Sequence, residues 1–189
     1  IIIGSRADSS AEQAVKDGFP VFSIEEATAK ADIVFILLPD EVAPDIFREQ
    51  IAPYLRPGDI VNFASAYNIT FNKITPPDFV DVVLAAPRMI GKGVRELYLK
   101  GEGFPAFVAV AQDYSGKALE YGKALCKAIG STKKGAIEVT FRDETFLDLM
   151  TEQATWPIIY NVFNEVFECE REMGHPDEAI LMEMYVSKE

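Results

Sequence analysis

The chain has few residues of the kinds that build metal clusters, disulfide frameworks or hydrolytic triads. Its 189 residues include two cysteines, Cys126 and Cys169, and one histidine, His175. The cysteines lack metal-ligand spacing, so we interpret them as buried thiols in a reducing compartment, which favours a cytoplasmic protein. A Ser/His/Asp triad would have to use His175, and nothing near this residue suggests a nucleophile.

Positive charge and long apolar runs are also scarce. The 18 lysines and arginines are outnumbered by 30 acidic residues, and the resulting net charge of −12 argues against nucleic acid as a partner. No apolar run reaches the roughly 18 residues that a membrane helix needs, so we expect no membrane partner. An anionic ligand would therefore need locally placed lysine or arginine side chains, or metal ions.

The sequence begins without methionine and without a signal-peptide pattern. Its first residues, 1–3, are an apolar run of the kind found in a strand. At the other end it stops within a helical pattern that has no cap. We therefore expect truncation at both ends. A lost transit peptide would make the protein organellar instead of cytoplasmic.

Over the first two thirds of the chain, short apolar runs alternate with amphipathic stretches. The apolar runs are continuous, which is typical of strands buried on both faces of a sheet. Strands are expected at residues 1–3, 33–38, 60–63, 80–85 and 106–110, and helices at 11–16, 23–30, 44–54 and 115–129. This alternation predicts an α/β fold with a Rossmann-like, doubly wound parallel sheet.

Beyond Glu138 the strand pattern stops. Helices are expected at residues 142–153, 158–173 and 176–189, with Pro157 ending or kinking the first of them. We therefore place an α/β dinucleotide-binding domain at residues 1–139 and the start of an all-helical domain at 140–189.

In a doubly wound sheet, ligands bind beyond the carboxyl ends of the strands. If residues 1–3 form the second strand of a dinucleotide fold, the loop after it meets the adenosine ribose. Arg6, Ser9 and Ser10 in this loop suit the 2′-phosphate of NADP(H). Asp8 weakens this interpretation because a carboxylate can accept from an unphosphorylated ribose, and a solvated surface turn is the alternative.

The glycine-rich fingerprint of dinucleotide-binding folds, G-x-G-x-x-G, is absent from the sequence. That turn would hold the pyrophosphate at a helix N-terminus. We therefore expect the first strand, the glycine-rich turn and its helix to lie upstream of Ile1.

Three further loops follow expected strands. Leu38, Pro39 and Asp40 come after the strand at residues 33–38 and would lie along the cofactor. The next loop, residues 63–69, contains Ser65. The last, residues 86–95, carries three cations including Arg88, which form either an anion-binding site or solvated surface charges.

Asp148 and Glu152 lie four residues apart, which places both carboxylates on one face of a helix. Like charges at this spacing repel each other, and a divalent cation would offset that repulsion. Mg²⁺ is commonly held by one or two carboxylates together with water and substrate. The pair is therefore a candidate magnesium site, although two such acids are more often a solvated helix face.

Several segments resemble the ketol-acid reductoisomerases, in the short form found in bacteria and archaea. One is Gly-Glu-Gly-Phe-Pro-Ala at residues 101–106; the others are residues 36–41, 63–69, 76–82, 86–87, 112–118 and 148–154. The resemblance implies a Rossmann domain followed by a knotted, dimerising helical domain. It also implies NADPH, or sometimes NADH, and Mg²⁺, used to convert acetohydroxy acids in branched-chain amino-acid biosynthesis.

The resemblance assigns roles to individual positions. Asp148 and Glu152 match the family's metal-binding acids, and Glu183 matches a glutamate that the partner subunit of a homodimer contributes. Ser65 stands where the family has an active-site histidine that also lies beside the cofactor. Arg88 stands where the family has a lysine. The predicted catalytic set is therefore Ser65, Arg88, Asp148 and Glu152.

These departures leave three interpretations of function open. The first is a reductoisomerase-type enzyme acting on acetohydroxy acids or on a related 2-keto acid. In the second, the chain belongs to a family member that has lost catalysis and serves as a nucleotide-binding or oligomeric module. The third is an enzyme of the β-hydroxyacid dehydrogenase kind, which lacks the paired metal carboxylates.

Overall fold

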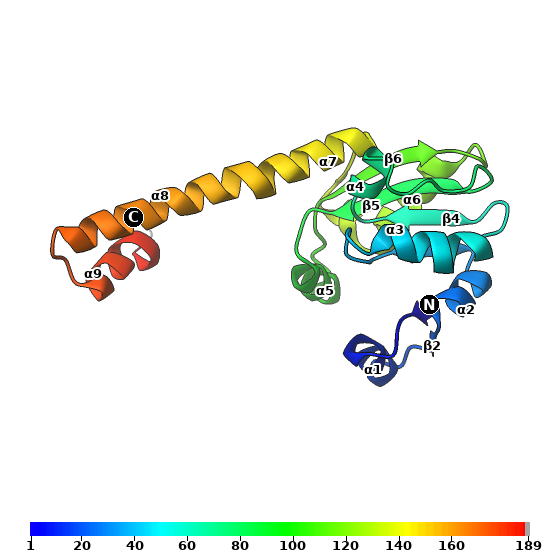
Figure 1. Ribbon diagram of the computed structural model, residues 1–189, viewed down its shortest axis with the longest axis horizontal. Coiled ribbons are helices and arrows are strands. Elements are labelled where there is room, and N and C mark those ends of the chain that lie inside the picture. Colours follow the sequence, from blue (N-terminus) through cyan, green and yellow to red (C-terminus); the bar gives the residue numbers. More distant parts are fainter. Residues whose placement is uncertain (188–189) are drawn as a thin grey trace. The chain divides into compact units, whose positions relative to one another are not determined.

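The computed structural model describes residues 1–187 and divides into two compact units, residues 1–145 and the chain from Phe146 onward (Figure 1). The domain boundary expected from the sequence, between residues 139 and 140, lies six residues before this division. The assignment of two domains stays a prediction. In the first unit, β1 (Ile3–Gly4) and β2 (Val21–Phe22) form a parallel pair. A second sheet has the strand order β3 (Ile33–Ile36), β4 (Ile60–Phe63), β5 (Asp81–Pro87), β6 (Ala106–Gln112) and β7 (Ala136–Glu138).

The five-stranded sheet is mostly parallel, which confirms the expected α/β fold class, but one strand runs the other way. β3, β4 and β5 are parallel neighbours, whereas β6 is antiparallel to β5, with Ala106 opposite Pro87. Helix α5 (Gly91–Lys100) connects these two strands. Because the chain re-enters the sheet beside the point where it left, α5 lies at the carboxyl end of β5 rather than across a face.

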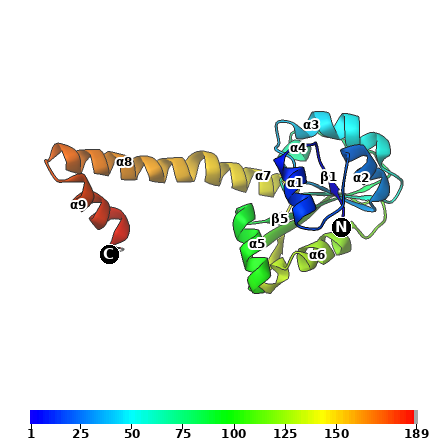
Figure 2. The same cartoon turned by 90° about the horizontal axis from the view of Figure 1, so that it is seen from below.

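Helices cover both faces of this sheet at its central strands, as the continuous apolar runs predicted. Val82 and Leu84 of β5 pack in one cluster with residues of α2 (Ile24–Lys30), α3 (Ala43–Ile46) and the π-helix η1 (Phe47–Ile51). Val83 and Ala85 point the opposite way, toward α6 (Ala118–Ala128). Figure 2 shows α3 and α6 on opposite sides of the strands. Each buried valine or leucine contributes roughly 1.5–3 kcal/mol.

Some elements carry little sequence signal. The strands β2 and β7 have two and three residues, too few to show a periodic pattern. Residues 91–95 were expected to be loop, yet they begin α5. Gly91 and Gly93 weaken the sequence signal for this helix, because each glycine lowers helix propensity by roughly 1 kcal/mol. The short helix α4 (Tyr67–Thr70) likewise falls in a stretch that was expected to be loop.

The regular structure in the described residues of the second unit is helical. Helix α7 (Phe141–Met150) begins in the first unit and continues into the π-helix η4 (Thr151–Thr155) and α8 (Trp156–Glu172). After a turn, α9 (Asp177–Leu181) leads into the π-helix η5 (Met182–Val186). No helix among residues 1–187 is long and apolar enough to span a membrane.

Of the two outcomes expected at Pro157, an end or a kink, the structure excludes the end, because helix continues through this residue. Instead the turn before it widens, and the N–H of Trp156 donates to the carbonyl of Thr151, five residues earlier. Proline has no N–H to donate, and its ring crowds the carbonyl four residues before it. A π turn before the proline widens the helix there, which relieves the crowding and tolerates the missing hydrogen bond. The same arrangement precedes Pro53, where the N–H of Ala52 donates to Phe47.

Candidate functional site

The loops after β3 and β4 meet at the carboxyl edge of the sheet, as their positions after parallel strands predicted. The Ser65 hydroxyl donates to Oδ2 of Asp40 at 3.0 Å. The side-chain amide of Asn68 donates to Oδ1 of Asp40 at 2.9 Å and to its carbonyl oxygen at 3.1 Å. Two residues predicted to bind cofactor, Asp40 and Ser65, are therefore direct hydrogen-bond partners.

Leu38 and Pro39 have different surroundings from Asp40. Leu38 is partly buried and packs against the core cluster that contains α3. The carbonyl of Pro39 accepts from the N–H groups of Val42 and Ala43, which starts the turn into α3. Of these three predicted cofactor residues, Asp40 is hydrogen-bonded to the loop after β4.

Arg88, at the end of β5, is held by a buried acid. Its Nη1 donates to Oε1 of Glu144 at 2.9 Å, and the guanidinium lies 4.9 Å from the ring centroid of Phe107. Oε2 of Glu144 accepts from the N–H of Ala66 at 3.0 Å. The Glu144 side chain is 3% exposed and that of Arg88 is 27% exposed. Glu144 thus joins the loops after β4 and β5 to helix α7.

Glu144 was not predicted as a site residue. Its spacing contained a signal, because Glu144, Asp148 and Glu152 follow one another at intervals of four residues. Three acids at this spacing share a helix face in an α-helix. The first of them is the buried partner of Arg88.

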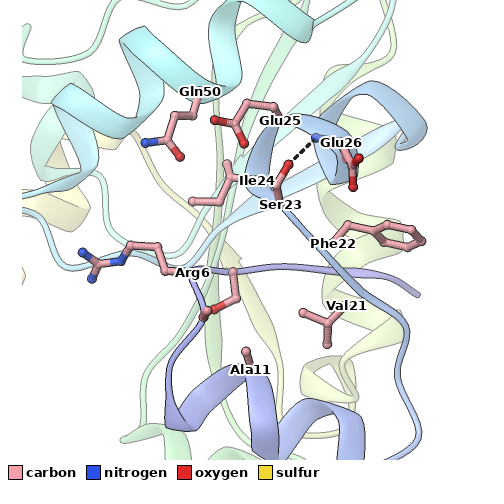
Figure 3. Close-up of a pocket in the computed structure, with 11 residues that line it drawn as sticks. Arg6, Ala11, Val21, Phe22, Ser23, Ile24, Glu25, Glu26 and Gln50 are labelled. Carbon is pink, nitrogen blue, oxygen red and sulfur yellow. Dashed lines mark hydrogen bonds between the residues drawn. The ribbon is translucent and has the colours of Figure 1, made fainter.

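Arg6, at the carboxyl end of β1, lines an open pocket of about 640 Å³ (Figure 3). The pocket also contains Ser5 from the same loop, Ile24 and Glu25 from the start of α2, and Gln50 from η1. In Figure 3 the side chains of Arg6, Ile24 and Gln50 extend toward the same side. The cavity therefore combines a guanidinium, an amide, the carboxylates of Glu25 and Glu26, and an apolar surface.

Helix α1 (Ser9–Lys16) explains the other residues of the first loop. Asp8 is its N-cap, and Oδ1 accepts from the N–H groups of Ser10 and Ala11 at 2.9 and 3.1 Å. Capping gives Asp8 a structural role that needs no ribose. Ser9 and Ser10 form the first turn of α1, outside the residues that line the pocket. The structure therefore places Arg6, rather than the two serines, in the pocket.

The predicted metal ligands lie in the second unit. Asp148 is partly buried on α7, Glu152 is exposed on η4, and Glu183 is exposed on η5. Among the described residues, no three His, Cys, Asp or Glu side chains gather closely enough to hold a metal ion. Asp148 and Glu152 lie four residues apart along one continuous helical segment, so the described part of the chain offers two of the predicted carboxylates there.

The sequence matches a family model described as acetohydroxy acid isomeroreductase, NADPH-binding domain, over residues 1–135. Ketol-acid reductoisomerases (NADP(+)) of Pyrococcus abyssi and Pyrobaculum calidifontis are both 48% identical to it, over 97% of this chain and 56% and 57% of theirs. The chain belongs to this family. It spans little more than half the length of the reductoisomerases that it matches.

A solved structure of an NADH-preferring ketol-acid reductoisomerase from an uncultured archaeon has a TM-score of 0.90 and 42% identity, covering 97% of this chain and 56% of that one. A 3-hydroxyisobutyrate dehydrogenase of Mycobacterium tuberculosis has a TM-score of 0.61 at 15% identity, which shows a shared fold alone. Family membership therefore argues against the third interpretation, the β-hydroxyacid dehydrogenase kind, and agrees with the first two, which both place the chain in this family.

Proposed function

We propose that the protein carrying this chain is an NADP(H)-dependent, Mg²⁺-assisted oxidoreductase of ketol-acid reductoisomerase type. Its substrate would be an acetohydroxy acid or a related 2-keto acid. The observation that carries the proposal is the joining of the β3, β4 and β5 loops by Asp40, Ser65, Arg88 and Glu144. These loops follow parallel strands at the edge where such sheets bind nucleotides.

Within this proposal, Arg6 would bind the 2′-phosphate of the cofactor from its pocket after β1. The Arg88 guanidinium would orient an anionic group, such as the carboxylate of a keto acid, because Glu144 fixes its position. Asp148 and Glu152 suit Mg²⁺ because hard cations prefer carboxylate oxygens, and Glu183 would arrive from a second subunit. When bound, the metal would polarise the hydroxyketone and the nicotinamide would supply hydride.

A strand upstream of Ile1 would complete the nucleotide-binding sheet. Among the described residues, β1 pairs only with β2, and β3 pairs only with β4. Ile33 and Phe35 of β3 are each 40% exposed, although the continuous apolar sequence of this strand predicts burial on both faces. A strand between β1 and β3, followed by a glycine-rich turn and a helix, would pair both edges and cover these side chains.

A homodimer would cover the apolar surface of α8. No residue of this 17-residue helix is buried, and Ile158, Tyr160 and Val162 are 62%, 60% and 58% exposed. Exposed apolar residues gathered along one element commonly mark an interface. A second copy of the chain is the occupant that the family resemblance implies.

The test uses the full-length protein with NADPH, NADH, 2-acetolactate and saturating Mg²⁺. Binding of a dinucleotide together with oxidation of NADPH in the presence of 2-acetolactate supports the proposal. Cofactor binding without turnover of any acetohydroxy or 2-keto acid would favour the non-catalytic module, an alternative motivated by Ser65 standing in the histidine position. Absence of dinucleotide binding would refute both.

A further inference from the structure

The hydrogen bond between Ser65 and Asp40 fixes the direction in which the serine hydroxyl points. A hydroxyl group has one proton to donate and two lone pairs to accept with. Both carboxylate oxygens of Asp40 accept, Oδ2 from Ser65 at 3.0 Å and Oδ1 from the Asn68 amide at 2.9 Å. The proton of Ser65 is therefore directed at Asp40 and is not available to a ligand.

The oxygen of Ser65 then has only acceptor capacity to offer. The N–H of Tyr67 approaches Oγ at 3.4 Å, a long contact that uses one lone pair weakly. Ser65 is partly exposed, so its Oγ is not sealed inside the core. A ligand group that contacts this oxygen must bring its own proton.

The position of Ser65 in the sheet indicates which part of a dinucleotide it meets. A doubly wound sheet consists of two halves, and each half binds one mononucleotide beyond the carboxyl ends of its strands. The Arg6 pocket follows β1, in the half that meets adenosine. Ser65 and Asp40 follow β4 and β3, in the half that meets the nicotinamide and the substrate.

We infer that Asp40 is a positioning residue that makes Ser65 Oγ a hydrogen-bond acceptor for a neutral N–H or O–H donor of the bound ligand. This inference rests on the proposed function. Two groups have the required chemistry, the carboxamide N–H of the nicotinamide and a hydroxyl of the substrate. The carboxamide is the better candidate because a dinucleotide bound to a doubly wound sheet would extend along its carboxyl edge.

The substitution Asp40→Asn tests this polarity because it reverses one hydrogen bond and keeps the shape. The oxygen of the introduced amide can still accept from Asn68, whereas its NH₂ group donates to Ser65. The serine proton then becomes available to the ligand, and Oγ changes from acceptor to donor. Ser65→Ala removes both capacities and gives the neutral reference.

The measurement is the ratio of dissociation constants for two cofactors on the full-length protein. One cofactor is NADPH; the other is its 3-acetylpyridine analogue, whose methyl ketone accepts but cannot donate. Because one neutral hydrogen bond is at stake, the wild type should bind NADPH about 3- to 10-fold more tightly than the analogue. Expressed as the dissociation constant of the analogue divided by that of NADPH, the ratio should approach one in Ser65→Ala and in Asp40→Asn. Neither variant offers an acceptor to the carboxamide N–H, and both ligands have a carbonyl that can accept from Ser65 in Asp40→Asn.

Asp78→Asn is the matched control, because it removes the same charge from an exposed position outside this network. It should keep the wild-type ratio, and thermal unfolding should confirm that every variant is folded. A second pair of ligands, a 2-hydroxy acid and the same acid without its hydroxyl, distinguishes the sources. A change confined to that pair would identify the substrate hydroxyl as the donor and still support the acceptor role.

Two failures have different meanings. If the wild type binds NADPH but neither ligand pair responds to Asp40→Asn or Ser65→Ala, the polarity inference is wrong and the proposed function stands. If the wild type binds no dinucleotide, the proposed function fails and the inference fails with it.

Discussion

The guanidinium of Arg88 and the buried carboxylate of Glu144 are 2.9 Å apart, and this pair connects the end of β5 to helix α7. A buried charge is tolerated when it is paired and hydrogen-bonded. Here the acid also accepts from the N–H of Ala66, so a single side chain holds three segments together. Arg88 is therefore placed by the fold and is not a freely solvated cation.

Breaking this pair should destabilise the protein. Arg88→Met leaves the Glu144 charge buried without this partner, so we expect the free energy of unfolding to fall by about 3–5 kcal/mol. Glu144→Gln should cost about 1.5–3 kcal/mol, the range for a hydrogen bond to a charged group. Chemical denaturation measures both losses. Arg48→Met, at an exposed ion pair with Asp45, is the control and should cost much less, because solvent screens an exposed pair. Equal effects at both arginines would contradict the buried pair.

Arg6 should make the full-length protein prefer NADP(H). Arg6→Ala removes a charge-assisted contact with the 2′-phosphate, which is commonly worth about 1.5–3 kcal/mol, so NADPH affinity should fall roughly 10- to 150-fold. NADH affinity should change much less. Fluorescence titration with both cofactors measures the difference, and Ser9→Ala tests a residue outside the pocket. Equal wild-type affinities, or tighter NADH binding that is lost on changing Asp8, would overturn the assignment.

Asp148 and Glu152 should be responsible for the stabilisation of the full-length protein by Mg²⁺. A ligand present at 100 times its dissociation constant stabilises the folded state by about 2.7 kcal/mol, which thermal unfolding detects. Asp148→Asn and Glu152→Gln should each remove most of this effect. Glu165→Gln, an exposed acid on α8, should retain it. A dimer structure that places Glu183 far from Asp148 of the partner subunit would refute the shared site.

Ser65 should make the enzyme better at reduction than at isomerisation. Isomerisation requires a tertiary hydroxyl to lose its proton, and a serine cannot titrate near neutral pH as a histidine can. We therefore expect faster turnover of 3-hydroxy-3-methyl-2-oxobutanoate, the isomerised intermediate, than of 2-acetolactate. General acid–base assistance is commonly worth about 10²–10⁴-fold, so NADPH oxidation should reveal the gap. Equal rates for the two substrates would show that Ser65 is no handicap.

Asp143 should contribute to the loss of folding stability at acidic pH. Its Oδ2 accepts from the hydroxyl and N–H of Thr140 at 2.7 and 3.0 Å, and these bonds hold the pKa of Asp143 below its usual value. A lowered folded-state pKa stabilises the fold at neutral pH, and this contribution disappears as pH falls through the folded-state pKa. Asp143→Asn should therefore lose less stability between neutral and acidic pH than the wild type. Identical pH profiles would rule out this contribution.

Local signals in the sequence predicted several features correctly. Continuous apolar runs indicated β3, β4, β5 and β6, because strands buried on both faces need apolar residues at successive positions. A helix was expected to start at residue 23, and the Ser23 hydroxyl caps it by accepting from the N–H of Glu26 at 3.2 Å. The helical spacing of Asp148 and Glu152 required no tertiary information.

Other features depend on contacts that no local pattern contains. The antiparallel direction of β6 depends on where α5 returns the chain, and the π turn before Pro157 depends on how a helix relieves a missing N–H. The Arg88–Glu144 pair spans 56 positions and the Ser65–Asp40 bond spans 25, so neither leaves a periodic trace. The sequence by itself determined which residue types follow each strand. Only the tertiary structure decided which side chains meet, because close packing brings distant segments within hydrogen-bonding distance.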